Sequence, residues 1–160
     1  MHPAIKTLSA LSVAFALAGC GTNEPPKPAK PEPARAIDGT FKASSLAHAK
    51  NLLMSSCSAN NLSMKSDKNV ITCEVKNPTR PRDRELTQAV NDEYATNIRE
   101  VYEFTLTEQG SDVGVKANSF ARYMAPVSVM SASQVRTRNL LDDASYDLLK
   151  KILNQAEVSY

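Results

Sequence analysis

The spacing of apolar residues predicts a helix at each end of the folding part of the chain. Over residues 45–57 apolar side chains recur at three- and four-residue steps, and Ser44 or Ser45 is placed to cap the first turn. A second helix is expected after Asp142 or Asp143, either of which can cap it. Its apolar stripe is Tyr146, Leu149, Ile152, Leu153 and Ala156.

Alternation of apolar and polar residues predicts strands between these helices. Residues 70–75 are rich in β-branched side chains and follow a polar turn at 58–67. Residues 97–108 and 113–121 alternate on either side of a turn-forming run, which predicts an antiparallel hairpin. A third segment is expected around Val127, Val129 and Met130, broken or placed at an edge by Pro126.

Between the first strand and the hairpin, residues 77–85 are expected to form a charged loop, and a short helix follows from Leu86 towards Glu93. This order of elements predicts an α+β fold. We expect an antiparallel sheet of three to four strands with N- and C-terminal helices packed on one face, formed by a single domain at residues 41–160.

Composition and charge limit the kind of core that the protein can form and the kinds of molecule that it can bind. Trp is absent and aromatic residues make up 6% of the chain, so the core must be mainly aliphatic. The formal charge is +2, and Lys6 is the only charged residue in 1–19. The remainder is therefore close to neutral, which gives no global electrostatic case for binding nucleic acid.

The first 19 residues have the layout of an export signal. Lys6 precedes an uncharged apolar run at residues 8–18, which is too short to span about 30 Å of hydrocarbon. The following Leu17-Ala18-Gly19-Cys20 resembles the lipobox of bacterial lipoproteins in all four positions.

This resemblance implies cleavage before Cys20 and attachment of lipid to its sulfur. Gly21 stands where an Asp tends to retain enterobacterial lipoproteins in the inner membrane, so the resemblance implies an outer-membrane anchor with the domain in the periplasm. The alternative is an ordinary signal peptide that ends by chance in a cysteine.

Residues 20–40 are expected to be a tether. Five of the nine prolines lie between residues 25 and 33, and few apolar side chains accompany them, which favours an extended, polyproline-like spacer. A docking peptide for a proline-binding partner or for the cell wall is the alternative.

The three cysteines fit this assignment. If lipid occupies Cys20, then Cys57 at the end of the first helix and Cys73 in the next strand remain as a pair. We expect them to form a disulfide in the oxidising periplasm. A reactive thiol pair or a metal site is the alternative, although neither cysteine has a Cys or His at zinc spacing.

The sequence offers little that indicates catalysis. His48 is the only histidine after the signal, and we expect it at a solvent-facing or boundary position. The acidic pairs at 92–93 and 142–143 are expected to cap helices or face solvent. No Gly-x-Ser-x-Gly elbow and no phosphate-binding Gly-rich loop occur. We therefore expect no enzyme activity, no cofactor and no metal.

Three arginines, Arg80, Arg82 and Arg84, form the most unusual local feature. Within the expected Pro-stiffened loop their guanidinium groups could bind phosphate, carboxylate or an acidic protein patch. A solvated loop partly neutralised by Asp83 and Glu85 is the alternative.

These features predict a non-catalytic, protein-binding accessory subunit of an envelope complex for secretion, conjugation or outer-membrane assembly. A lipoprotein that binds a small ligand, a glycan or an anionic lipid is the second hypothesis. It would be favoured by a cavity lined by Tyr102, Phe104 and Tyr123, and a filled sheet face would count against it. An enzyme, the third hypothesis, would need a buried titratable cluster around His48.

Overall fold

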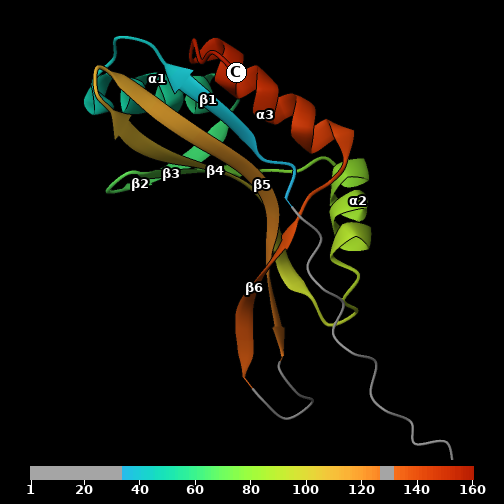
Figure 1. The fold of residues 1–160 in the computed structure, drawn as a ribbon. Helices are drawn as coiled ribbons and strands as arrows, with labels where there is room; N and C mark the ends of the chain where they lie inside the picture. Colours follow the sequence, from blue (N-terminus) through green and yellow to red (C-terminus); the bar gives the residue numbers. More distant parts are fainter. Residues whose placement is uncertain (1–33, 127–131) are drawn as a thin grey trace, which may run out of the picture. The chain divides into compact units, whose positions relative to one another are not determined.

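The computed structural model describes residues 34–126 and 132–160, all within one compact unit, Pro31–Tyr160. Within them it shows an α+β fold with three helices and a six-stranded antiparallel sheet (Figure 1). In chain order the elements are β1 (Ile37–Phe41), α1 (Leu46–Ala59), β2 (Leu62–Asp67), β3 (Val70–Val75), α2 (Arg80–Val90), β4 (Thr96–Gln109), β5 (Asp112–Pro126), β6 (Ser133–Asn139) and α3 (Asp143–Gln155).

The strands β4 and β5 form a long hairpin in the interior of the sheet. The strand order is β1-β5-β4-β3-β2, and β6 also pairs with β5. On the side of β5 away from β4, β1 pairs with residues 113–117 and β6 with residues 120–126. The strands β1 and β6 therefore follow one another along the same edge of β5.

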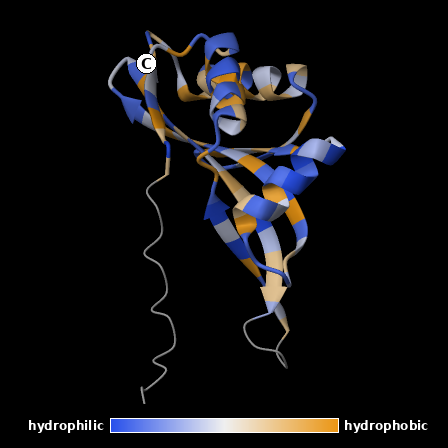
Figure 2. Ribbon diagram, turned by 90° about the vertical axis from the view of Figure 1, so that its right-hand side faces the viewer, coloured by the Kyte–Doolittle hydropathy of each residue, from blue (hydrophilic) through white to orange (hydrophobic). Residues whose placement is uncertain are grey.

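One face of the sheet carries the core. Alternate residues of β4 and β5 point towards α1 and α3, and the largest side chains there, including Leu53, Phe104 and Ile152, are fully buried. Each such side chain contributes about 1.5–3 kcal/mol through burial. Hydrophobic and hydrophilic residues alternate along the elements as this arrangement requires (Figure 2).

The helix α2 packs on the same face, farther along the hairpin. Leu86 and Val90 contact Ala121, Tyr123 and Leu140 in a second apolar cluster. These β5 residues share the odd-numbered face with Val113 and Val115 of the main core. All three helices thus cover one face of the sheet, and no helix of the described residues covers the other.

A disulfide joins α1 to β3. The sulfur atoms of Cys57 and Cys73 lie 2.03 Å apart, and neither residue is exposed to solvent. The pairing predicted from the cysteine count is therefore present in the structure.

Several predicted elements are confirmed. Ser45 caps α1, because its hydroxyl accepts the His48 N–H at 3.2 Å, and Asp142 caps α3 by accepting the Ser145 N–H at 3.0 Å. The strand β3 and the β4–β5 hairpin form as expected, and Gly110 provides the left-handed turn residue with φ of +68°.

The predicted number of strands is wrong, because the sheet has six and not three to four. The strand β2 occupies the expected polar turn, and only its first residue is buried. The strand β1 begins at Ile37, inside the segment assigned to the tether. All three additional strands, β1, β2 and β6, lie at sheet edges, where the apolar alternation is weak or short.

The prediction of a charged loop at 77–85 is also wrong, because the helix α2 begins at Arg80 and ends at Val90. Proline at 81 lies in the first turn, where its missing N–H costs nothing and its fixed φ suits a helix.

Several predictions fall outside the described residues: the export signal at 1–19, the lipobox with Cys20, the tether up to residue 33, and the strand expected around Val127, Val129 and Met130. No helix in the described ranges is long and apolar enough to cross a membrane.

Candidate functional site

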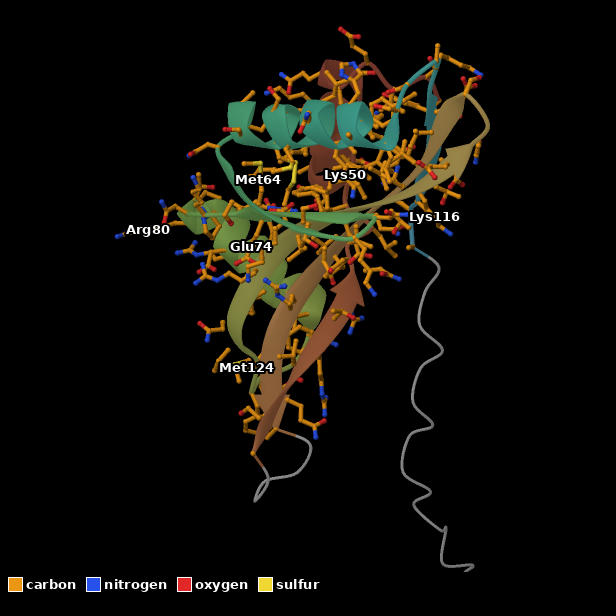
Figure 3. All side chains as sticks on the ribbon, turned by 90° about the vertical axis from the view of Figure 1, so that its left-hand side faces the viewer. Lys50, Met64, Glu74, Arg80, Lys116 and Met124 are labelled. Atoms are coloured by element: carbon orange, nitrogen blue, oxygen red, sulfur yellow. A yellow bond between two sulfur atoms is a disulfide. The ribbon has the colours of Figure 1, made fainter. Side chains whose placement is uncertain are left out.

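The structure does not bring the three candidate arginines together. Arg80 and Arg84 lie one turn apart on the exposed side of α2, and Figure 3 shows Arg80 directed away from the sheet. Arg82 points the opposite way, and its side chain is only 14% exposed. Helix geometry therefore separates a cluster that would have converged in a loop.

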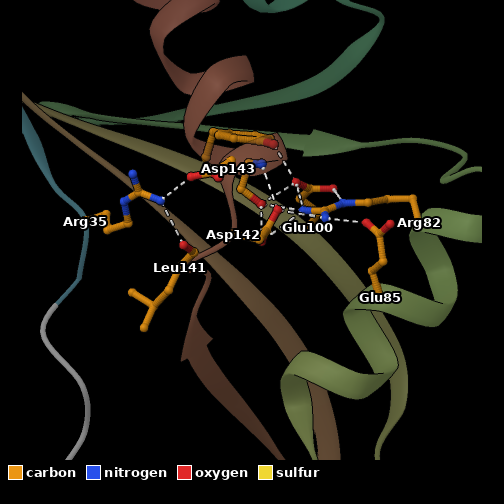
Figure 4. Close-up of polar contacts among 9 residues, drawn as sticks. Arg35, Arg82, Glu85, Glu100, Leu141, Asp142 and Asp143 are labelled. Carbon is orange, nitrogen blue, oxygen red and sulfur yellow. Dashed lines mark hydrogen bonds and ion pairs between the residues drawn. The ribbon is translucent and has the colours of Figure 1, made fainter.

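Arg82 is held by carboxylates from three elements (Figure 4). Its Nε and Nη2 donate to the two oxygens of Glu100 on β4, at 2.9 and 2.6 Å. Its Nη1 donates to Asp142 at the start of α3 and to Glu85 of its own helix, both at 2.9 Å. A bidentate pair of this kind fixes the guanidinium plane as well as its charge.

Glu100 is the buried centre of this network, with only 4% of its surface exposed. The Tyr102 hydroxyl donates to it at 2.5 Å, and the Ser145 hydroxyl at 2.9 Å. Since its partners lie on α2, β4 and α3, the network ties the two helices to the sheet. These buried hydrogen bonds and ion pairs stabilise the packing of the helices on the sheet, and they do not form an open binding site.

The environment shifts the pKa of three groups in the network. Hydrogen bonding to Glu100 raises the pKa of Arg82, and burial, reinforced by the Glu100 charge, raises that of Tyr102. Burial opposes ionisation of Asp142, but the Ser145 N–H and the Arg82 guanidinium outweigh it and lower the pKa of that carboxyl. At neutral pH Arg82 and Asp142 are therefore charged, whereas the Tyr102 hydroxyl is neutral and donates its hydrogen bond.

Sequence reasoning missed this network, although one signal was available. Glu100 falls on the same face of its strand as Tyr102 and Phe104, so a charged residue occupies a core position. Such a residue requires a buried partner of opposite charge. The pattern alone does not identify Arg82 as that partner.

An open groove of about 810 Å³ lies between the end of α2, the following loop and β6. Two tyrosines line it, Tyr94 at 60% exposure and Tyr123 at 8%. Arg136 and Arg138 line it from β6. Asp92 and Glu93 line it as well, and the Asp92 carboxylate lies 3.8 Å from Arg136, so the groove combines aromatic rings with charged groups of both signs.

Local geometry positions these groove residues. The helix α2 ends at Val90, and the left-handed conformation of the next residue, Asn91 (φ of +48°), turns the chain. The Asp92 carboxylate then accepts the Tyr94 N–H at 3.1 Å. Arg136 donates to the Pro126 carbonyl at 3.2 Å, and Arg138 donates to the Val90 carbonyl at 3.1 Å. Both guanidinium groups are therefore folded back over the groove.

The opposite face of the same end of the sheet carries a smaller hollow of about 270 Å³. Glu74 pairs there with Arg122 and lies 3.7 Å from Arg99, and Glu74 and Met124 are labelled in Figure 3. Val135 of β6, also at this hollow, is 65% exposed.

The predicted ligand cavity is not formed by its three aromatic residues. Tyr102 and Phe104 have no exposed surface inside the core, whereas Tyr123 lies at the groove. The filled sheet face counts against a ligand at that place. His48 is exposed on α1.

No group of three or more His, Cys, Asp or Glu side chains suited to a metal ion occurs in residues 34–126 or 132–160. Comparison of the sequence with protein-family models gives no match, and no curated protein matches it significantly.

Proposed function

We propose that this chain is an outer-membrane-anchored periplasmic lipoprotein whose domain binds another protein as a non-catalytic accessory subunit of an envelope complex. The anchor rests on the lipobox at Leu17–Cys20 and on the Pro-rich segment ahead of β1. A tethered domain meets membrane partners at high effective concentration, so moderate affinity suffices.

The observation that supports binding most is the composition of the surface around β6. Tyr94 and Val135 are large exposed side chains on opposite faces of this end of the sheet, and Arg136 lies beside Tyr94 in the groove. Tyrosine and arginine are the residues most enriched where protein interfaces gain their binding energy.

A second candidate function is binding of a glycan or an anionic lipid headgroup in the groove. Its volume of about 810 Å³ lies in the range of small-molecule sites, and two arginines line it beside Asp92 and Glu93, of which Asp92 lies 3.8 Å from Arg136. The groove is open rather than enclosing, however, which favours a macromolecular partner.

Site-specific photo-crosslinking in intact cells tests the proposal. A photoreactive amino acid replaces Tyr94 or Val135, and Lys151 on the exposed side of α3 serves as the control position. We expect a discrete protein adduct from both test positions and none from the control. Absence of any adduct at 94 and 135, or equal adducts at all three positions, would contradict it.

A further inference from the structure

The described residues that line the groove at the end of α2 carry no net charge. The charged ones are two acids, Asp92 and Glu93, and two arginines, Arg136 and Arg138. Arg136 lies 3.8 Å from the Asp92 carboxylate, so part of this charge is neutralised within the groove. An ionic ligand gains affinity from a surplus of opposite charge, which these four groups do not offer. The groove therefore suits a polar ligand without charge.

Tyr94 offers a flat apolar surface at this groove. The residue is 60% exposed, yet the turn that carries it is fixed by two hydrogen bonds. The Asp92 carboxylate accepts the Tyr94 N–H at 3.1 Å, and the Asp92 carbonyl accepts the Ala95 N–H at 3.0 Å. The other apolar side chains that line the groove, Val90 and Tyr123, are buried. A single exposed ring on a fixed turn is a stacking surface and not an apolar pocket.

Three planar polar side chains of the groove, those of Gln88, Asn91 and Glu93, make no hydrogen bond or ion pair within the described part of the chain. An amide both donates and accepts, and a carboxylate accepts at two oxygens. Both arginines of the groove, in contrast, already donate to backbone carbonyls. The groups left for a ligand are therefore mainly two amides and one carboxylate.

Ring sugars match this combination of groups. The C–H face of a pyranose packs on an aromatic ring, while its neighbouring hydroxyl groups, each both donor and acceptor, pair with planar amides and carboxylates. A phosphate ligand would need a surplus of positive charge, and a protein segment would find a single exposed ring. Because the groove is open rather than enclosing, it also accommodates a chain that extends beyond one sugar.

We propose that this groove binds an uncharged oligosaccharide, with one sugar ring stacked on Tyr94 and its hydroxyl groups bonded to the amides of Gln88 and Asn91. This rests on the proposed envelope function and specifies the ligand of its second form. Val135 lies on the opposite face of this end of the sheet and stays available to the proposed protein partner. The domain would thereby connect a protein to a glycan of the envelope.

The test measures binding of three uncharged hexasaccharides, chitohexaose, cellohexaose and maltohexaose, by isothermal titration calorimetry. The full chain is purified in a detergent without a sugar headgroup, so that the detergent does not compete. Tyr94→Ala removes the stacking ring, whereas Tyr94→Phe retains it. Tyr160→Ala is the matched control, because Tyr160 is 53% exposed and does not line the groove.

We expect at least one hexasaccharide to bind the parent, Tyr94→Phe and Tyr160→Ala alike, and to bind Tyr94→Ala at least about tenfold more weakly. Raising the salt concentration from about 0.05 to about 0.5 M should leave this affinity unchanged, because the ligand has no charge. In NMR spectra of the parent, the side-chain amide signals of Gln88 and Asn91 should shift on titration, a readout that needs no variant.

Glycan binding is overturned if none of the three hexasaccharides binds at about millimolar concentration, or if Tyr94→Ala binds as the parent does while folded. It is also overturned if the amide signals of Gln88 and Asn91 do not move, or if inorganic phosphate displaces the sugar, which would indicate an anion site. Protein adducts in cells would uphold the proposed function even if no sugar binds, and sugar binding without adducts would contradict only the protein contact. The two failures are therefore distinguishable.

Discussion

Arg82 is a poor candidate for binding a ligand, because its guanidinium group is already bound to carboxylates within the chain. Its two neighbours in the motif, Arg80 and Arg84, face solvent, whereas Arg82 satisfies Glu100, Asp142 and Glu85 at once. Buried ion pairs of this kind add little over an apolar replacement, but removing one partner leaves the other charge unpaired.

Replacing Arg82 by methionine should therefore lower the free energy of unfolding by about 3–5 kcal/mol, because Glu100 stays buried without its cation. Urea denaturation measures this change. Arg84→Met, on the exposed side of the same helix, should change stability by less than about 0.5 kcal/mol. Equal effects of the two substitutions would show that the network contributes nothing specific.

Asp142 should make folding sensitive to acid. Its pKa is lower in the folded chain than the ordinary value of about 3.9, so its stabilising effect is present above that pH and is lost as pH falls through the folded pKa. Asp142→Asn retains a capping side chain but not the charge. The stability difference between parent and variant should shrink below about pH 4.

Denaturation series at several pH values measure this difference. Asp147→Asn is the control, because Asp147 lies on the same helix and its side chain is 68% exposed. This substitution should change the free energy of unfolding at low pH only slightly. If the difference in free energy of unfolding between the parent and Asp142→Asn stays constant down to about pH 2, the charge of Asp142 is not the cause of the acid sensitivity.

Among the elements, those with a one-sided apolar pattern could be predicted from the sequence. The stripes of α1 and α3 and the alternation of β3, β4 and β5 follow directly from which side chains the core buries. The edge strand β2 buries only Leu62, and α2 is anchored mainly by Leu86 and Val90. Local pattern cannot identify elements whose stability comes from neighbours supplied by tertiary packing.

The proposed binding surface around β6 could not be predicted for the same reason. Tyr94 and Arg136 share one groove, with Val135 on the opposite face, only because β6 pairs with the second half of β5, a register that no local spacing specifies. The cysteine pair could be predicted, because counting cysteines required no three-dimensional information.

The disulfide stabilises the contact of α1 with β3. Replacing Cys57 and Cys73 together by alanine should lower the free energy of unfolding by about 3 kcal/mol, as expected for a closed loop of this length. Chemical denaturation measures the loss. Thiol counting on the denatured, unreduced mature chain should find no free thiol at either position, and finding two would contradict the pairing in cells.

For the whole molecule, the proposed membrane attachment depends on Cys20, which precedes the described residues in the sequence. Cys20→Ser should abolish lipidation and move the protein from the membrane fraction to the soluble periplasmic fraction, because no lipid chain then holds it. Thr22→Ser, which leaves the signal and the lipobox unchanged, is the control and should leave the mature protein in the membrane. Unchanged fractionation of Cys20→Ser would overturn the anchor.

The clasp between Thr40 and Ser159 joins the first strand of the described fold to its last residues. A chain that emerges N-terminus first, from a ribosome or through a translocation pore, exposes β1 long before either β5 or the C-terminal residues are available. The pairing of β1 with β5 therefore has to wait for residues 113–117, and the bridge from Thr40 has to wait for Ser159. The contact between Thr40 and Ser159 is therefore expected to form late in folding, after the strands that lie between these residues in the sequence have become available.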